Sequence, residues 1–287
     1  MRTVQFFSEG LPIAATLRTG PTGGSARRPA IICAQGFSLT RDVFMPQFAE
    51  AFVKAGYVTL NLDYRGFGES GGEPRCRLLP LEQARDLGNA ITWLQQQPEV
   101  DPERIGLFGI SLGASVALQT AGTDVRVRAV VCCAGPGDLE RVWSAFPDFA
   151  RFRAKVDAAK REFVNTGKVT YVSVPRILSA DPDTCALLVR DQPKHPTWRL
   201  EITFESLADL FAFKPENVAQ NARASLFIYP AEDALIAKGE VVSMYAKARE
   251  PKQLVALEGM KHHEVYGDGR AFEPVLDASL DFFAKRL

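Results

Sequence analysis

A serine flanked by glycines has the surroundings in this chain that best suit covalent chemistry. The five residues Gly109 to Gly113 read G-x-S-x-G, with an apolar run before them over 104–108 and small residues after them over 114–118. This spacing predicts a strand that turns sharply into a helix and exposes the Ser111 hydroxyl on a strained turn, a nucleophile elbow. The glycines remove side chains that would collide with the strand and the helix. Ser111 is therefore the candidate nucleophile, and an ordinary N-cap serine is the alternative.

A serine hydroxyl is a poor nucleophile at neutral pH and needs an imidazole to take its proton. The chain has three histidines: His195, His262 and His263. His195 lies between two prolines, where we expect an exposed or packing role. His262 and His263 lie in a turn-rich loop after the last apolar strand-like run. Adjacent loop residues cannot be separated by periodicity, so the residues alone leave both open as the base.

The imidazole in turn needs a carboxylate that orients it and stabilises its cation. Asp233 is the candidate because it closes a short loop after the apolar run 226–229. Its side chain is then expected at the same sheet edge as Ser111, and the chain order becomes serine, aspartate, histidine. Glu232 is the alternative acid. A lone loop carboxylate is more often a solvated surface group, so only its position favours Asp233.

Strands and helices alternate around these groups, which predicts an α/β fold with a mostly parallel sheet. An antiparallel pair is expected at the start, over 4–7 and 13–18, followed by a flexible turn-forming connection at Pro21 to Ser25. Further strands are expected at 29–34, 57–63, 104–110, 127–133, 224–230 and 252–257. Helices are expected at 45–55, 81–97, 112–118, 238–248 and 274–287.

The alternation stops over residues 136–224, although a crossover between neighbouring strands needs only about a dozen residues and a helix. The segment has a helical pattern broken by prolines. We therefore expect a helical cap over 138–205, inserted between two parts of the core, 1–137 and 206–287.

Aromatic residues recur at three-residue spacing within this expected cap. Such a stripe either contacts substrate or only packs the cap on the core. We take three of its members as candidate substrate contacts: Trp143, Phe146 and Phe149.

The composition excludes several classes of protein. The chain has 287 residues, 46% of them hydrophobic, which is enough for a large core. Lys plus Arg and Asp plus Glu are both 34, so no basic excess is available for nucleic acid. The N-terminus lacks a signal-peptide pattern, and no apolar run approaches the roughly 20 residues of a membrane span. We expect a soluble cytoplasmic protein with no nucleic-acid or membrane partner.

The five cysteines form an odd set without metal-ligand spacing or a C-x-x-C pair. Two of them are adjacent in an apolar strand-like run. This pattern is typical of buried free thiols in a reducing compartment, and we expect neither a metal nor a cofactor. The cysteines are Cys33, Cys76, Cys132, Cys133 and Cys185.

Over nearly its whole length the chain resembles the α/β-hydrolase superfamily, whose motifs it carries in order. Gln35-Gly36-Phe37 occupies the place of the oxyanion-loop H-G-x, and residues 63–70 are similar to the D-x-R-G-x-G-x-S turn. The elbow follows, and then Asp233 and His262. The sequence of residues 65–72 and the later H-x-x-x-Y pattern look most like those of one branch, the dienelactone-hydrolase-like and X-prolyl-peptidase-like esterases. The resemblance implies an α/β-hydrolase fold and a serine-hydrolase mechanism.

The resemblance also chooses between the adjacent histidines. The motif G-x-x-H-x-x-x-Y matches residues 259–266 with His262 as the base. His263 then stands where the family often has an aromatic residue and becomes a candidate substrate contact. Asp63, which ends a strand, is implied to be a structural turn residue without a catalytic role.

An oxyanion hole needs backbone N–H donors where charge develops on the attacked carbonyl. Leu112, directly after the nucleophile at a helix N-terminus, supplies one donor by geometry, and the resemblance implies Phe37 as the other. Gln35 replaces the usual histidine. Because the donors are backbone groups, the hole should survive this change. We expect Gln35 to affect how the loop is braced and include it among the candidate substrate contacts.

The sequence thus predicts a carboxylesterase-like serine hydrolase that cleaves an ester, thioester or amide through an acyl-enzyme. We expect a small to medium apolar or aromatic substrate as its partner, and a homodimer is compatible with the sequence. One alternative is carbon–carbon bond hydrolysis or acyl transfer to an acceptor other than water. A non-catalytic ligand-binding protein on the same fold is the alternative from another class, and three candidate triad members argue against it.

Overall fold

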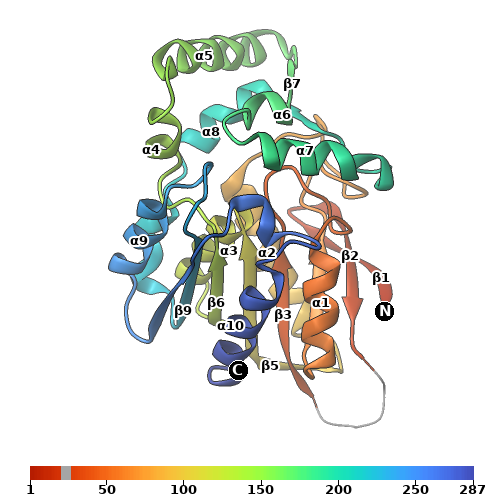
Figure 1. Cartoon of the computed structure of the whole chain (residues 1–287). Helices are drawn as coiled ribbons and strands as arrows, with labels where there is room; N and C mark the ends of the chain where they lie inside the picture. Colours follow the sequence, from red (N-terminus) through yellow and green to blue (C-terminus); the bar gives the residue numbers. More distant parts are fainter. Residues whose placement is uncertain (21–26) are drawn as a thin grey trace.

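The computed structural model describes residues 1–20 and 27–287 and is built on one eight-stranded sheet (Figure 1). The connection expected at Pro21 to Ser25 lies outside the described residues. Strand β2 runs antiparallel to its neighbours β1 and β4, and the strands from β4 onward are parallel. In spatial order the strands are β1 (Arg2–Ser8), β2 (Leu11–Arg18), β4 (Val58–Leu62), β3 (Arg28–Ala34), β5 (Val100–Ile110), β6 (Val127–Cys133), β9 (Ser225–Pro230) and β10 (Lys252–Leu257). The predicted α/β class is confirmed.

Helices cover both faces of the sheet. Helices α1 (Met45–Lys54) and α10 (Phe272–Ala284) pack against each other on one face. On the other face lie α2 (Pro80–Leu94) and α3 (Leu112–Thr123), with α9 (Lys238–Lys247) joined to α3 through the 3₁₀ helix η3 (Pro215–Asn221). Because both faces are covered, the central strands are apolar along their length rather than alternating.

Aromatic contacts hold the first face together. The ring centroids of Phe48 and Phe108 lie 4.8 Å apart, and those of Phe52 and Phe283 lie 5.8 Å apart. These pairs join α1 to β5 and α1 to α10, in tilted and edge-on arrangements that aromatic rings favour. Strand β5 is therefore fixed over its buried half, which ends at Ser111.

The cysteines are free, as predicted. All are buried except Cys185, which is partly exposed. Burial raises the pKa of Cys33 to about 12, so this thiol stays protonated at neutral pH. The cysteines therefore act as small apolar residues of the core.

The D-x-R-G-x-G-x-S turn is a structural feature of the core. Asp63 is buried, and its carboxylate accepts hydrogen bonds from the backbone N–H groups of Arg41 at 2.7 Å and Glu69 at 3.0 Å. Gly68 has a φ of +50°, and a Cβ there would lie 2.3 Å from the Asp63 carboxylate. The turn thus ties two loops to the end of β4, which agrees with the structural role that the resemblance implied for Asp63.

Residues 134–224, here called the connecting segment, join β6 to β9 and extend beyond the carboxyl ends of the strands (Figure 1). Helix α5 lies at the outermost end of the molecule in this view. The two short strands β7 and β8 form an antiparallel pair that the sequence pattern did not predict. The main elements are α4 (Leu139–Ser144), α5 (Phe149–Thr166), β7 (Tyr171–Ser173), α6 (Val174–Ile177), α7 (Pro182–Asp191), β8 (Glu201–Thr203) and α8 (Leu207–Phe211).

Polar contacts attach the connecting segment to the core. Arg141 of α4 pairs with Glu240 of α9, with its Nε atom 2.5 Å from Oε1. His195 Nδ1 lies 3.0 Å from Asp42 Oδ2, and the His195 ring meets Trp198 edge-on. His195 therefore has the packing role expected for it.

Candidate active site

Ser111 lies between the end of β5 and the start of α3 and has φ 55° and ψ −129°. A non-glycine residue held in such a sparsely populated region costs on the order of 1–3 kcal/mol, and the surrounding structure must enforce it. The Ser111 backbone N–H donates to the Cys133 carbonyl of β6 at 2.8 Å, which extends the sheet pairing into the turn. The predicted strand–turn–helix geometry is therefore present at Ser111.

The glycines on either side of Ser111 are required by close backbone contacts. A Cβ at Gly109 would lie 2.4 Å from the carbonyl oxygen of Gly113. A Cβ at Gly113 would lie 2.1 Å from the carbonyl oxygen of Ala34 and 2.5 Å from that of Gln35. All three distances are shorter than any side chain tolerates. The elbow consequently packs directly on the loop that begins at Gln35.

His262 and Asp233 form a buried pair near this edge of the sheet. His262 Nδ1 lies 2.7 Å from Asp233 Oδ2, and the exposed fractions of the two side chains are 2% and 1%. The other carboxylate oxygen accepts hydrogen bonds from the backbone N–H groups of Leu235 and Ile236, both at 2.8 Å. These bonds fix the carboxylate toward the imidazole. Glu232, the alternative acid, is exposed.

The surroundings of His262 shift its affinity for a proton in two opposing ways. Burial by itself lowers the pKa of His262, and the charge and hydrogen bond of Asp233 raise it. The net result is a pKa above the usual 6.5. In the neutral ring, the bond to Asp233 places the proton on Nδ1 and leaves Nε2 as an acceptor. The pair can therefore take up a proton through Nε2, as a general base must.

Tyr266 is a further polar residue in this site that we did not predict as functional. It is 4% exposed and lines the same cavity as Ser111 and His262. A Cβ at Gly36 would lie 2.8 Å from its hydroxyl oxygen. Burial raises the pKa of Tyr266 and the neighbouring Ser111 side chain lowers it; the net pKa is raised, so the hydroxyl stays protonated. Its position four residues after His262 was the only sequence signal.

Phe37 and Leu112, the predicted oxyanion-hole residues, both line the cavity beside Ser111. Gln35 does not line it. The Gln35 side chain is buried and its Nε2 donates to the carbonyl of Leu62 at the end of β4. Gln35 therefore braces the loop, and its proposed contact with substrate finds no support in this orientation.

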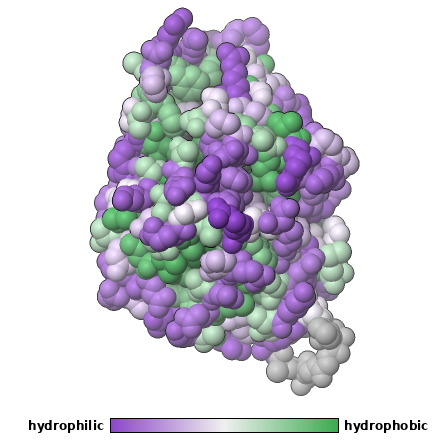
Figure 2. Space-filling view, in the orientation of Figure 1, coloured by the Kyte–Doolittle hydropathy of each residue, from purple (hydrophilic) through white to green (hydrophobic). Residues whose placement is uncertain are grey.

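The cavity above Ser111 has a volume of about 840 Å³. Its base contains Ser111, His262 and Tyr266, and its walls come mostly from the connecting segment. Space-filling colours show hydrophobic residues reaching the surface in the upper part of the molecule, beneath α5, among hydrophilic ones (Figure 2). This volume suits a substrate with a sizeable apolar portion.

The aromatic stripe of the connecting segment both packs and lines the cavity. Trp143, Phe146 and Phe149 all contribute to the cavity wall. Trp143 also stacks on Phe152 with ring centroids 5.7 Å apart, and Phe149 meets Phe211 edge-on at 5.4 Å. The two interpretations of the stripe are therefore compatible, because one side of these rings packs while another faces the cavity.

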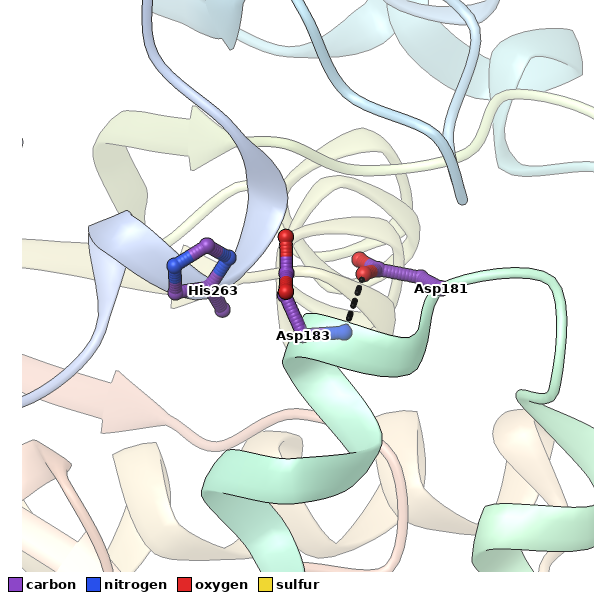
Figure 3. A group of neighbouring side chains, drawn as sticks. All are labelled: Asp181, Asp183 and His263. Carbon is purple, nitrogen blue, oxygen red and sulfur yellow. Dashed lines mark hydrogen bonds between the residues drawn. The ribbon is translucent and has the colours of Figure 1, made fainter.

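His263 lies beside the start of helix α7 (Figure 3) and is not among the residues that line the cavity. Its nearest polar neighbours are Asp181 and Asp183, with one candidate ligand atom of each residue within 4.8 Å of the others. Asp181 caps α7 by accepting a hydrogen bond from the Asp183 backbone N–H at 3.1 Å, and Asp183 pairs with Lys261 at 2.8 Å. Because these carboxylates already have partners, the group suits a polar link between α7 and the histidine loop better than a metal site.

A model of the family described as serine aminopeptidase, S33, matches residues 25–268. The chain belongs to this family of α/β-hydrolases. The family assignment accounts for the sheet, the elbow and the order of the motifs. The narrower resemblance to dienelactone-hydrolase-like and X-prolyl-peptidase-like esterases is untested by these comparisons and stays a prediction.

Relatives of this α/β-hydrolase span nearly its whole length. An uncharacterized 31.7 kDa Escherichia coli protein from the traX-finO intergenic region is 32% identical over 98% of this chain and 97% of its own. Thiohydrolase aneE of Aspergillus aculeatus is 27% identical, with coverages of 97% and 91%. Polyketide transferase grgF of a Penicillium species is 28% identical, with coverages of 95% and 93%.

The fold of this family member also matches solved structures. The structure of DcsB in complex with its substrate analogue superposes with a TM-score of 0.87, at 22% identity, over 100% of this chain and 99% of that one. At this identity the match concerns the fold. Within residues 1–20 and 27–287, each helix is too short or too polar to cross a bilayer.

Proposed function

We propose that this protein is a serine hydrolase that removes a bulky apolar acyl group from a thioester or ester through an acyl-enzyme on Ser111. The observation that carries the proposal is the buried His262–Asp233 pair, whose His262 lines the same largely apolar cavity as the strained Ser111. Nucleophile, base and orienting carboxylate are the parts that such chemistry needs.

The reaction follows from these positions. The Ser111 hydroxyl oxygen attacks the carbonyl carbon, and its proton passes to Nε2 of His262. The backbone N–H groups of Leu112 and Phe37 donate to the oxyanion, an interaction typically worth a few kcal/mol per donor. When the tetrahedral intermediate collapses, the leaving thiol or alcohol takes the proton from His262. Water then attacks the acyl-enzyme with the same base, and Ser111 is released with its proton.

The walls of the cavity argue for a bulky apolar acyl group. Trp143, Phe146 and Phe149 face the space above Ser111. Each apolar side chain that a substrate covers contributes on the order of 1–3 kcal/mol of binding. A short acyl group would leave most of this surface uncovered. The proposal includes thioesters as well as esters because a relative that matches nearly the whole chain is named a thiohydrolase.

Acyl transfer to an alcohol or amine is the second candidate. It uses the same acyl-enzyme, and an acceptor replaces water in the last step. Its support is that another relative over the whole chain is named a polyketide transferase. The two candidates differ only in which nucleophile reaches the acyl group.

The test is labelling followed by turnover. A fluorophosphonate should modify the protein once, on the peptide that contains Ser111, and Ser111→Ala should abolish the modification. An octanoyl series with thioester, ester and amide leaving groups, assayed with and without alcohol acceptors, then separates hydrolysis from transfer by its products. Unchanged labelling or turnover in folded Ser111→Ala would overturn the proposal.

A further inference from the structure

We propose that the outer part of the same cavity is a binding site for an anionic group of the substrate, formed by Arg151, Lys155 and Arg176. This inference rests on the proposed function, because it concerns the substrate that reacts at Ser111. It specifies a substrate whose reacting carbonyl is joined through a linear chain to a phosphate or a carboxylate.

All three cations line the cavity that contains Ser111. Arg151 and Lys155 are four residues apart in α5, so their side chains lie on the same face of that helix. Arg176 comes from the short helix α6 on another wall. The three side chains belong to exposed residues, which places their charged ends at the opening rather than in the dry interior.

These three cations have no carboxylate partner, in contrast to two other cations of α5. Arg153 and Lys160 of α5 form ion pairs with Glu140 at 2.9 Å and Asp209 at 2.6 Å. Across the part of the chain that the structure describes, neither Arg151, Lys155 nor Arg176 forms an ion pair within 4.0 Å. Arg161 of α5 is likewise outside the ion pairs but does not line the cavity. The three cations that line the cavity are therefore available for a ligand.

The charge of the cavity opening is consequently positive. Asp148, at the start of α5, is the one Asp or Glu side chain among the described residues that line the cavity. The lining thus has one carboxylate and three cations. An anionic group there would gain electrostatic attraction without the full cost of burial, because the opening is in contact with water.

The order of the groups along the cavity defines the substrate. Ser111 lies at the carboxyl edge of the sheet, and α5 lies at the far end of the connecting segment (Figure 1). Helix α4 lies between the sheet and α5 in this view, and its Trp143 lines the cavity. The substrate would thus place its carbonyl at Ser111, a linear chain along the rings, and an anion at α5 and α6.

Two sources could supply this anion. In a thioester of a phosphorylated thiol carrier, such as coenzyme A, the phosphates belong to the leaving group. In a dicarboxylic acyl chain, the carboxylate lies at the end remote from the reacting carbonyl. Both present the same chemistry to the cations, and matched substrates distinguish them.

The experiment compares three thioesters. Octanoyl-N-acetylcysteamine is neutral, octanoyl-coenzyme A carries phosphates, and the monothioester of suberic acid with N-acetylcysteamine carries a terminal carboxylate. For at least one anionic member, kcat/KM should exceed that of the neutral thioester by about tenfold, mainly through KM. The advantage should shrink as ionic strength rises from about 0.01 M to about 1 M. Whichever anionic substrate shows the advantage identifies the source.

The variant R151Q/K155Q/R176Q should lose this advantage, with a larger loss on the anionic substrate than on the neutral one. Arg161→Gln is the matched control, since Arg161 is an exposed cation of α5 that does not line the cavity. Equal kcat/KM for neutral and anionic thioesters, or equal losses on both in a triple variant of unchanged Tm, would overturn the anion site. Turnover of the neutral thioester that depends on Ser111 would leave the proposed function standing in either case.

Discussion

The Nδ1 atom of His262 lies 2.7 Å from Oδ2 of Asp233, and neither side chain has appreciable contact with solvent. A buried carboxylate is costly unless its oxygens are bonded, and here both oxygens are: one to the imidazole and one to two backbone N–H groups. The pair is therefore preorganised before substrate arrives.

The Asp233–His262 contact predicts a specific pH dependence. Because the pKa of His262 is raised, kcat/KM should increase with pH through an inflection above 6.5, where the imidazole becomes neutral. In Asp233→Asn the carboxylate is lost while burial remains, so the inflection should move to lower pH. The maximal rate should fall by about 10⁴, the loss known for the matching change in chymotrypsin-type triads. The pH–rate profiles of both proteins check this, and an unshifted inflection would contradict it.

The same shift predicts how stability depends on pH. The folded protein holds the His262 proton more tightly than the unfolded chain, so this group stabilises the fold fully below a pH of about 6.5. That contribution should be lost as pH rises through the folded-state pKa. Denaturant unfolding of wild type and His262→Gln across this range measures it, and parallel curves would exclude it.

The backbone strain at Ser111 predicts an inactive but more stable variant. Ser111→Gly removes the proposed nucleophile and the Cβ that makes φ 55° costly, so the free energy of unfolding should rise by about 1–3 kcal/mol. Ser111→Ala is the matched control, because it is equally inactive but keeps the Cβ. Equal stability of the two variants would show that the surrounding structure relaxes at this turn.

The Tyr266 hydroxyl predicts a loss of rate without a loss of fold. Tyr266→Phe keeps the ring packed against Phe44 and removes the hydroxyl that neighbours Ser111. We expect kcat to fall by about 10-fold to 100-fold, somewhat less than for loss of an oxyanion-hole donor, with KM and Tm nearly unchanged. A change confined to KM would show that the hydroxyl contacts substrate rather than the nucleophile.

Two phenylalanines of the connecting segment separate substrate contact from packing. Phe146 has a single close aromatic partner, Trp143, whereas Phe152 meets Trp143, Phe204 and Phe211. Phe146→Ala should raise KM for octanoyl substrates more than for acetyl substrates and change Tm little. Phe152→Ala should lower Tm, since truncating a well-packed Phe costs about 3–5 kcal/mol. Equal effects of Phe146→Ala on both acyl lengths would assign Phe146 to packing as well.

Periodicity and turn chemistry predicted the sheet, its helices and the elbow, because each depends on residues close together in the sequence. The boundaries shifted by a few residues: the helix expected to reach Gln97 ends at Leu94, and the elbow strand begins at Val100. The three-residue strands β7 and β8 are too short to show a period of two. Their pairing depends on contacts across the connecting segment.

The adjacent histidines illustrate why part of the site could not be predicted from the residues alone. His262 and His263 open a 3₁₀ turn, His262–Val265, in which successive side chains point about 120° apart. One of them therefore turns to Asp233 and the other to α7. The packing of α7 and of the Asp233 loop on this turn decides which histidine meets Asp233, and both elements are remote in sequence from the turn. His262→Ala should abolish most turnover, and His263→Ala should retain kcat; the reverse result would reassign the base.

The base and the walls of the cavity come from different parts of the chain, which has an evolutionary consequence. The base depends on short loops at the strand ends, each locked by close contacts such as that of Gly113 with Ala34, so substitutions there are rarely tolerated. The walls come mostly from one contiguous stretch of chain, 134–224, which joins β6 to β9. Drift, insertion or recombination within that stretch can change which acyl group is accepted while the reactive centre is inherited intact. Selectivity in this lineage can therefore diversify faster than mechanism.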